Sequence, residues 1–173
     1  FGSLAQILLL TGQRRGEVAK MRWAELDLDS AIWHLPAIST KTGNAHDVPL
    51  SNLAIDLLSN TPRFNGEFVF TTTGGERPVS GFSKAKARID GATTTFLPWR
   101  FHDLRRTFST HLEELDVAKP VIGALLNHTN ASVTAIYTRA ELMRAKRQAM
   151  EKYSTLLEGY IHLPEERGAI IHL

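Results

Sequence analysis

The 173-residue sequence contains no cysteine, which excludes disulfides, thiolate metal sites and cysteine nucleophiles. It also lacks the run of roughly 18 apolar residues that a membrane-spanning helix needs. Its longest candidate, Leu4 to Leu10, is interrupted by Gln6 and ends at Thr11-Gly12. Gly-rich phosphate loops and a Gly-x-Ser-x-Gly nucleophile elbow are missing as well. What is present is a composition typical of a folded globular protein, with 43% apolar and 22% charged residues.

The ends and the length of the chain predict its domain organisation. The length predicts a single domain over residues 1–173. The start, Phe1-Gly2-Ser3-Leu4, has no initiator methionine and no basic region, so it is not a signal peptide. We expect a chain that was cut inside a longer protein.

The net charge is only +2, but the charges are unevenly distributed. Residues 80–112 hold six basic and two acidic residues, and residues 139–152 hold five basic and two acidic residues. An acidic patch of Glu113, Glu114 and Asp116 lies between them. The basic segments predict either a phosphate-binding surface or ordinary solvated helix faces, and charge alone does not separate the two.

Hydrophobic spacing predicts a mainly helical chain with a small antiparallel sheet near its N-terminal third, an α+β class. Pro49 places the second strand at a sheet edge, and Ser51 is the expected N-cap of the following helix. A polar loop is expected over Gly91 to Thr95. The expected strands cover 31–36, 48–50 and 68–70. The expected helices cover 4–10, 14–23, 51–58, 80–89, 102–115, 120–126, 132–136 and 139–160.

Two pairs of polar residues stand three positions apart, so each pair shares one face of a helix. Arg14 and Glu17 form the first pair, in which a carboxylate fixes a guanidinium and leaves donors for an anion. A surface ion pair has the same pattern. His102 and Arg105 form the second pair, near a helix N-terminus, where an anion is favoured. A capping histidine beside a solvated arginine is the alternative.

Histidines and tyrosines supply the remaining candidates. His128 follows an apolar pair at a helix end, and Tyr137 stands nine residues later. On its own, such a tyrosine is more often packed than catalytic. The seven histidines include no i, i+4 pair and no zinc-ligand spacing with carboxylates, so we expect no metal site.

Taken together, the order and spacing of these motifs resemble the tyrosine recombinase (phage integrase) family over essentially the whole chain. The resembling segments are Thr-Gly-Gln-Arg-Arg-Gly-Glu, Thr-Lys-Thr-Gly before Val-Pro-Leu, His-Asp-Leu-Arg-Arg-Thr-Phe and Leu-Asn-His. Within the family, the first and last of these segments are similar to those of integrases from prophages and genomic islands. The resemblance places the family's catalytic residues on Arg14, Lys41, His102, Arg105, His128 and Tyr137, with Glu17 as a supporting acid. Many relatives have glycine where Asn127 stands, and asparagine also tolerates a left-handed helix end.

The resemblance implies the catalytic-domain fold of that family, without its N-terminal core-binding and arm-binding domains. It implies that Tyr137 attacks DNA to give a 3′-phosphotyrosine, that Arg14 and Arg105 hold the phosphate, and that Lys41 protonates the leaving 5′ oxygen. His102 and His128 would add hydrogen bonds. Phosphate contacts elsewhere are expected from Lys84, Lys86, Arg88 and Arg106.

The same resemblance implies the partners: double-stranded DNA attachment sites, a homotetramer on DNA that is a monomer as an isolated fragment, and accessory factors that bend DNA or set direction. No cofactor and no association with a membrane are expected. The expected location is the bacterial cytoplasm, in association with the nucleoid. A type IB topoisomerase and a DNA-binding module with vestigial catalysis stay open as alternatives. The last helix has an apolar stripe that could pack on its own domain or on a neighbouring protomer.

Overall fold

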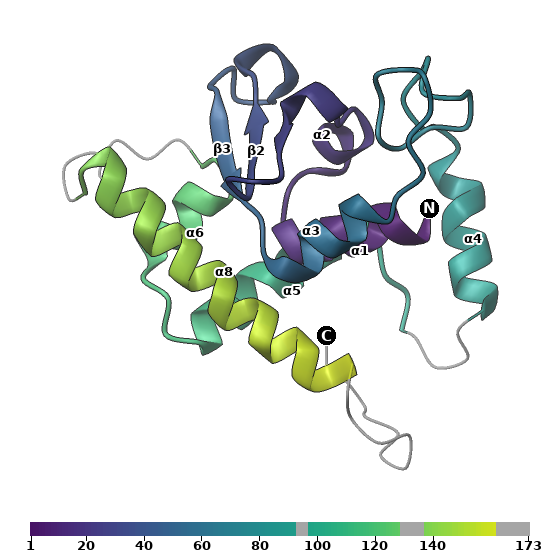
Figure 1. Ribbon diagram of the computed structural model, residues 1–173. Coiled ribbons are helices and arrows are strands. Elements are labelled where there is room, and N and C mark those ends of the chain that lie inside the picture. The colour runs from purple at the N-terminus through teal and green to yellow at the C-terminus, as the bar shows by residue number, and fades with distance from the viewer. Residues whose placement is uncertain (93–96, 129–136, 162–173) are drawn as a thin grey trace.

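The structure is a computed structural model that describes residues 1–92, 97–128 and 137–161. These residues form mainly helices, with one small antiparallel sheet at one side of the molecule, as predicted (Figure 1). The helices are α1 (Gly2–Thr11), α2 (Arg15–Ala19), α3 (Asn52–Ser59), α4 (Phe82–Ala92), α5 (Phe101–Glu114), α6 (Lys119–Leu125) and α8 (Arg139–Ile161). Two short 3-10 helices are η1 (Trp23–Glu25) and η2 (Ala37–Ser39), and the strands are β1 (Leu26–Asp27), β2 (Ile32–Leu35) and β3 (His46–Pro49).

The sheet has the order β1-β2-β3, with both neighbouring pairs antiparallel. Trp33 at its centre pairs with Leu26 on one side and Val48 on the other, and its side chain is fully buried. β3 is an edge strand, which confirms the prediction made from Pro49, because proline has no N–H to give to a second neighbour.

The strand predicted over 68–70 is wrong. Phe68 makes only an isolated bridge to Arg22, and the N–H of Val69 donates to the carbonyl of Met21 at 2.9 Å. The third strand is instead Leu26–Asp27. Three consecutive buried residues resemble a strand in the sequence, but their partner segment turns into η1 after one bridge. The helix predicted over 14–23 is also too long, since α2 ends at Ala19.

Local signals explain where the other helices begin and end. α1 stops at Gly12, whose φ of 64° is left-handed and where a Cβ would overlap the ring of Phe108. The Ser51 hydroxyl accepts the N–H of Ala54, confirming it as the N-cap of α3. α4 runs through Ala92, so Gly91 is helical and not part of a polar loop. The rest of that loop and the helix predicted over 132–136 lie outside the described residues.

α1 crosses the centre of the molecule, with the sheet and α2 on one side and α5 and α8 on the other (Figure 1). Ile7 of α1 and Phe108 of α5 are fully buried, and Tyr153 of α8 packs edge-on against Phe108 with ring centroids 4.9 Å apart. The apolar stripe of α8 therefore packs against its own domain. In the described ranges, no helix is long and apolar enough to span a bilayer.

Candidate active site

The carboxylate of Glu17 organises the first part of the site. It is almost completely buried and accepts the Arg14 backbone N–H at 3.1 Å and the Arg14 Nη1 at 3.2 Å. The same carboxylate accepts the backbone N–H of Lys41 at 3.2 Å. Arg14 is the N-cap of α2, and its side chain is only partly buried. One buried acid thus aims a guanidinium at the surface and fixes the position of Lys41, a link that the sequence did not predict.

Lys41 lies in the turn between β2 and β3, as expected for a hairpin lysine. Its backbone is tied to Glu17, whereas its side chain is exposed. A long, exposed side chain on an anchored turn can swing its ammonium group towards a bound anion without moving the sheet.

Arg105 is the most deeply placed cation of the site. It lies in the second turn of α5, is 6% exposed, and donates to the carbonyls of Gly12 at 2.7 Å and Leu126 at 2.5 Å. Burial and the nearby positive charge of Arg14 lower the pKa of Arg105 to about 10, so it stays charged at neutral pH. The effect of Arg14 shows that the two guanidinium groups lie close enough to repel each other.

His128 completes this cluster from the end of α6. Its N–H bonds to the carbonyl of Gly123 and that of Asn127 to Ala124, while Asn127 has a φ of 51°. This is a Schellman motif, and it confirms that asparagine adopts the left-handed position. Arg105 Nη2 lies 3.2 Å from His128 Nε2. Since a guanidinium can only donate, Nε2 accepts and the ring proton sits on Nδ1.

The electrostatics of His128 agree with this neutral form. Burial, followed by the charges of Arg105 and Arg14, lowers the pKa of His128 below its usual value. The cluster therefore contains two guanidinium groups, one buried carboxylate and one neutral imidazole. Its excess positive charge suits it to bind an oxyanion.

The two other candidates lie at the ends of long helices. His102 is exposed at the second position of α5, one turn before Arg105. Tyr137 lies two residues before the start of α8, is half-buried and packs against the core. The segment that joins His128 to Tyr137, residues 129–136, lies outside the described residues. The structure brings Arg14, Glu17, Lys41, Arg105 and His128 together, and attaches Tyr137 to the N-terminus of α8.

The residues expected to make phosphate contacts fall into two groups. Lys84 and Arg88 are exposed on α4, at the far side of the molecule from α6 (Figure 1). Lys86 is half-buried; it pairs with Asp90 and lies over the ring of Trp99 at 4.7 Å. Arg106 is exposed and pairs with Asp103 at 3.2 Å.

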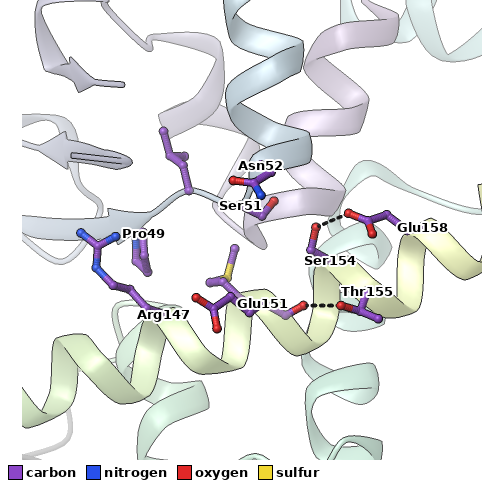
Figure 2. Close-up of a pocket in the computed structure, with 10 residues that line it drawn as sticks. Pro49, Ser51, Asn52, Arg147, Glu151, Ser154, Thr155 and Glu158 are labelled. Carbon is purple, nitrogen blue, oxygen red and sulfur yellow. Dashed lines mark hydrogen bonds between the residues drawn. The ribbon is translucent and has the colours of Figure 1, made fainter. Parts of the chain in front are cut away.

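A polar cleft of about 300 Å³ lies elsewhere, between α8 and the corner where β3 leads into α3 (Figure 2). Arg147, Glu151 and Glu158 of α8 line it, facing Ser51 and Asn52, and none of the candidate catalytic residues does. Within the described ranges, no group of three or more histidines and carboxylates could hold a metal ion.

Sequence reasoning missed three buried polar residues beside the cluster: Gln13, His46 and Lys146. Gln13 and His46 bond to the end of α6, and Lys146 donates to the carbonyl of Asp47. The available signal was proximity to the motifs: Gln13 lies inside Thr-Gly-Gln-Arg, and His46 lies two residues before Val-Pro-Leu.

Comparison with known proteins gives a consistent result. The model of the phage integrase family matches residues 2–143. The prophage integrase IntZ of Escherichia coli K12 is 30% identical over 161 residues, which cover 90% of this chain and 39% of IntZ. The tyrosine recombinase XerD of Listeria monocytogenes is 28% identical over 157 residues, covering 83% of this chain and 51% of XerD. The chain thus spans about half or less of the length of these relatives.

Among solved structures, the integrase of the transposon Tn1549 in complex with circular intermediate DNA has a similar fold. The TM-score is 0.60 at 19% identity, and the match covers 83% of this chain and 56% of that one. The mainly helical fold with its small sheet is therefore the fold of these recombinases.

Proposed function

The chain belongs to the phage integrase family of tyrosine recombinases, and from this premise we propose that it is the catalytic part of a site-specific DNA recombinase. The proposed reaction cleaves and rejoins DNA strands through a covalent 3′-phosphotyrosine, for integration or excision of a mobile element. The observation that carries the proposal is the cluster of Arg14, Arg105 and neutral His128 around the buried Glu17.

Arg14 and Arg105 hold the non-bridging oxygens of the scissile phosphate in this proposal. Their forked donors match phosphate geometry, and charge placed in advance at a developing anion stabilises the transition state. His128 and His102 add hydrogen bonds to the phosphate and assist proton movement at the tyrosine. Glu17 acts through Arg14 and Lys41, which it holds by hydrogen bonds.

Tyr137 is the proposed nucleophile. Its phenol oxygen forms a bond to phosphorus as the bond from phosphorus to the 5′ oxygen breaks, and the phenol proton passes to His102, because Nε2 of His128 already accepts from Arg105. Lys41 gives a proton to the departing 5′ oxygen. The energy of the broken ester is retained in the phosphotyrosine, so neither a metal nor a nucleotide is required, and the reverse attack by a 5′ hydroxyl rejoins the strand.

The proposed partners follow from the reaction. They are double-stranded DNA attachment sites and three further protomers, since two rounds of strand exchange need four active sites, together with factors that bend DNA or set direction. The DNA complex of the Tn1549 integrase, which has the same fold, supports DNA as the substrate. A bacterial cytoplasmic location near the nucleoid belongs to the same proposal, as does the assignment of residues 1–173 to one catalytic domain.

The decisive experiment is a suicide-substrate assay. The chain, and a longer version with its preceding residues, is incubated with a nicked duplex that carries a candidate attachment site, and adducts are resolved on a denaturing gel. We expect a heat-stable protein–DNA adduct from the wild type and none from Tyr137→Phe at equal DNA affinity. An adduct from Tyr137→Phe would refute the assignment of the nucleophile. Relaxation of supercoiled DNA without strand exchange would instead indicate a topoisomerase.

A further inference from the structure

The C-terminal end of α6 is the point where three other parts of the chain converge. A helix leaves its last carbonyl groups without partners inside the helix. Here the Leu125 carbonyl accepts Gln13 Nε2 at 2.8 Å and His46 Nε2 at 3.0 Å, and the next carbonyl, of Leu126, accepts Arg105 Nη2 at 2.5 Å. The α1–α2 loop, β3 and α5 are therefore all bonded to two consecutive residues.

Gln13 connects this point to the first arginine. Its side chain is 1% exposed, and its Nε2 donates to the carbonyl of Thr11 at 2.9 Å as well as to Leu125. It stands between Gly12, whose carbonyl accepts Arg105, and Arg14, which pairs with Glu17. The amide of Gln13 thus fastens the loop of Arg14 to the end of α6.

His46 makes the same connection from the strand that follows the Lys41 turn. Because a carbonyl can only accept, Nε2 of the buried ring must carry a proton. Burial and the charge of Lys146 on α8 lower the pKa of His46 to about 4, so the ring donates as a neutral tautomer. The other charged groups acting on it are Asp47 of its own strand and Arg105 of α5.

We propose that Gln13 and His46 are positioning residues: by holding the Leu125 carbonyl from two sides, they set where His128 stands relative to Arg105, Arg14 and Lys41. His128 follows Leu125 by three residues, and the Schellman hydrogen bonds at Asn127 and His128 leave little freedom between them. A shift of the Leu125 carbonyl therefore moves the imidazole. The catalytic part of this inference rests on the proposed function, whereas the structural part does not.

The experiment compares substitutions that remove each donor with substitutions that keep it. Gln13→Met and His46→Leu remove a donor at similar volume, and His46→Gln keeps an N–H near the position of Nε2. Val48→Ala is the matched control, because Val48 is fully buried on the same face of β3 and bonds to nothing on α6. Two readouts are measured below the melting temperature: the NMR titration of the His128 ring, and the rate and half-saturation of adduct formation on a suicide substrate.

In His46→Leu and Gln13→Met we expect the His128 pKa to rise towards its ordinary value of about 6.5, because the ring moves away from Arg105. We expect the rate at saturating DNA to fall at least tenfold while half-saturation changes less than threefold. His46→Gln should restore most of both readouts, and Val48→Ala should change neither. The proposal is overturned if both donor deletions keep the wild-type His128 titration, or if Val48→Ala alters it equally. Should the wild type form no adduct, the proposed function fails while the His128 titration still decides the positioning role.

Discussion

At the scale of single residues, the site depends on the ion pair between Arg14 and the buried Glu17. The two groups are 3.2 Å apart, and Glu17 also accepts two backbone N–H groups. Burial of the carboxylate makes this arrangement more rigid than a surface ion pair, which contributes little. The sequence was also compatible with an ordinary surface ion pair. The structure excludes that alternative, because the carboxylate is buried and accepts from three donors.

Replacing Arg14 by alanine should slow strand cleavage at least roughly 10²-fold, since losing one preformed charge donor at a developing anion costs about 2.7–4 kcal/mol in comparable sites. The rate is measured by single-turnover adduct formation. Arg63→Ala is the control, because Arg63 stacks on Trp23 with 5.1 Å between its guanidinium carbon and the ring centroid. Equal losses in the two variants would mean that arginines contribute only general attraction to DNA.

The buried His46 should make the protein sensitive to acid. Its pKa is lowered to about 4 in the fold, against about 6.5 unfolded, so the unfolded chain binds more protons between these values. The neutral ring then contributes up to about 3 kcal/mol of stability that is present above pH about 6.5 and lost as the pH falls towards about 4. Urea unfolding across this range should give a flatter acid limb for His46→Gln. If the free energy of unfolding fell equally steeply with pH in the wild type and the variant, His46 would not be the cause of the acid sensitivity.

At the scale of elements, α8 joins the core of the domain to the proposed nucleophile. Residues Ala149, Met150, Tyr153 and Leu157 are buried against the domain, and the Tyr153 hydroxyl donates to the carbonyl of Leu9 at 3.2 Å. Tyr137 lies two residues before this helix, so the packing that stabilises the domain also anchors the proposed nucleophile.

Tyr153→Ala should lower the free energy of unfolding by about 3–5 kcal/mol, because it removes a fully buried ring from the contact with Phe108. Tyr160, about two helical turns further on and 39% exposed, is the matched control in the same helix. Tyr160→Ala should cost no more than about 1 kcal/mol, the cost of a surface change. Denaturant unfolding measures the free energy of unfolding of both variants. Similar losses would mean that the C-terminal end of α8 stabilises the domain as much as its centre does.

At the scale of the whole molecule, the charge distribution separates the site from a second basic surface. The proposed catalytic cluster lies where α1, α5 and α6 meet, whereas Lys84 and Arg88 are exposed on α4 at the other side of the molecule (Figure 1). The net charge of +2 is too small to attract DNA by itself, so local surfaces must do so.

Removing Lys84 or Arg88 should reduce the salt dependence of DNA binding. Each phosphate that a basic residue neutralises contributes about −0.9 to the slope of log affinity against log salt. Lys86→Ala should change the slope less, because Lys86 already pairs with Asp90. Fluorescence anisotropy from low to moderate salt measures the three slopes. Unchanged slopes for Lys84→Ala and Arg88→Ala would remove α4 from the DNA surface.

The sequence by itself determined most of the helices, the edge position of Pro49, the cap at Ser51, the left-handed Asn127 and the family, because each of these depends on local chemistry or short spacing. Local spacing could not predict contacts between residues that lie far apart in the chain. Residues 68–70 have the pattern of a strand, but in the fold they make one isolated bridge, from Phe68 to Arg22, and the apolar stripe of α8 suited either its own domain or a neighbour. The bonds from His46 and Gln13 to Leu125 cross 79 and 112 residues. Only the tertiary structure decided these contacts, because the donors and the carbonyl they share become neighbours only when α1, β3, α5 and α6 pack together.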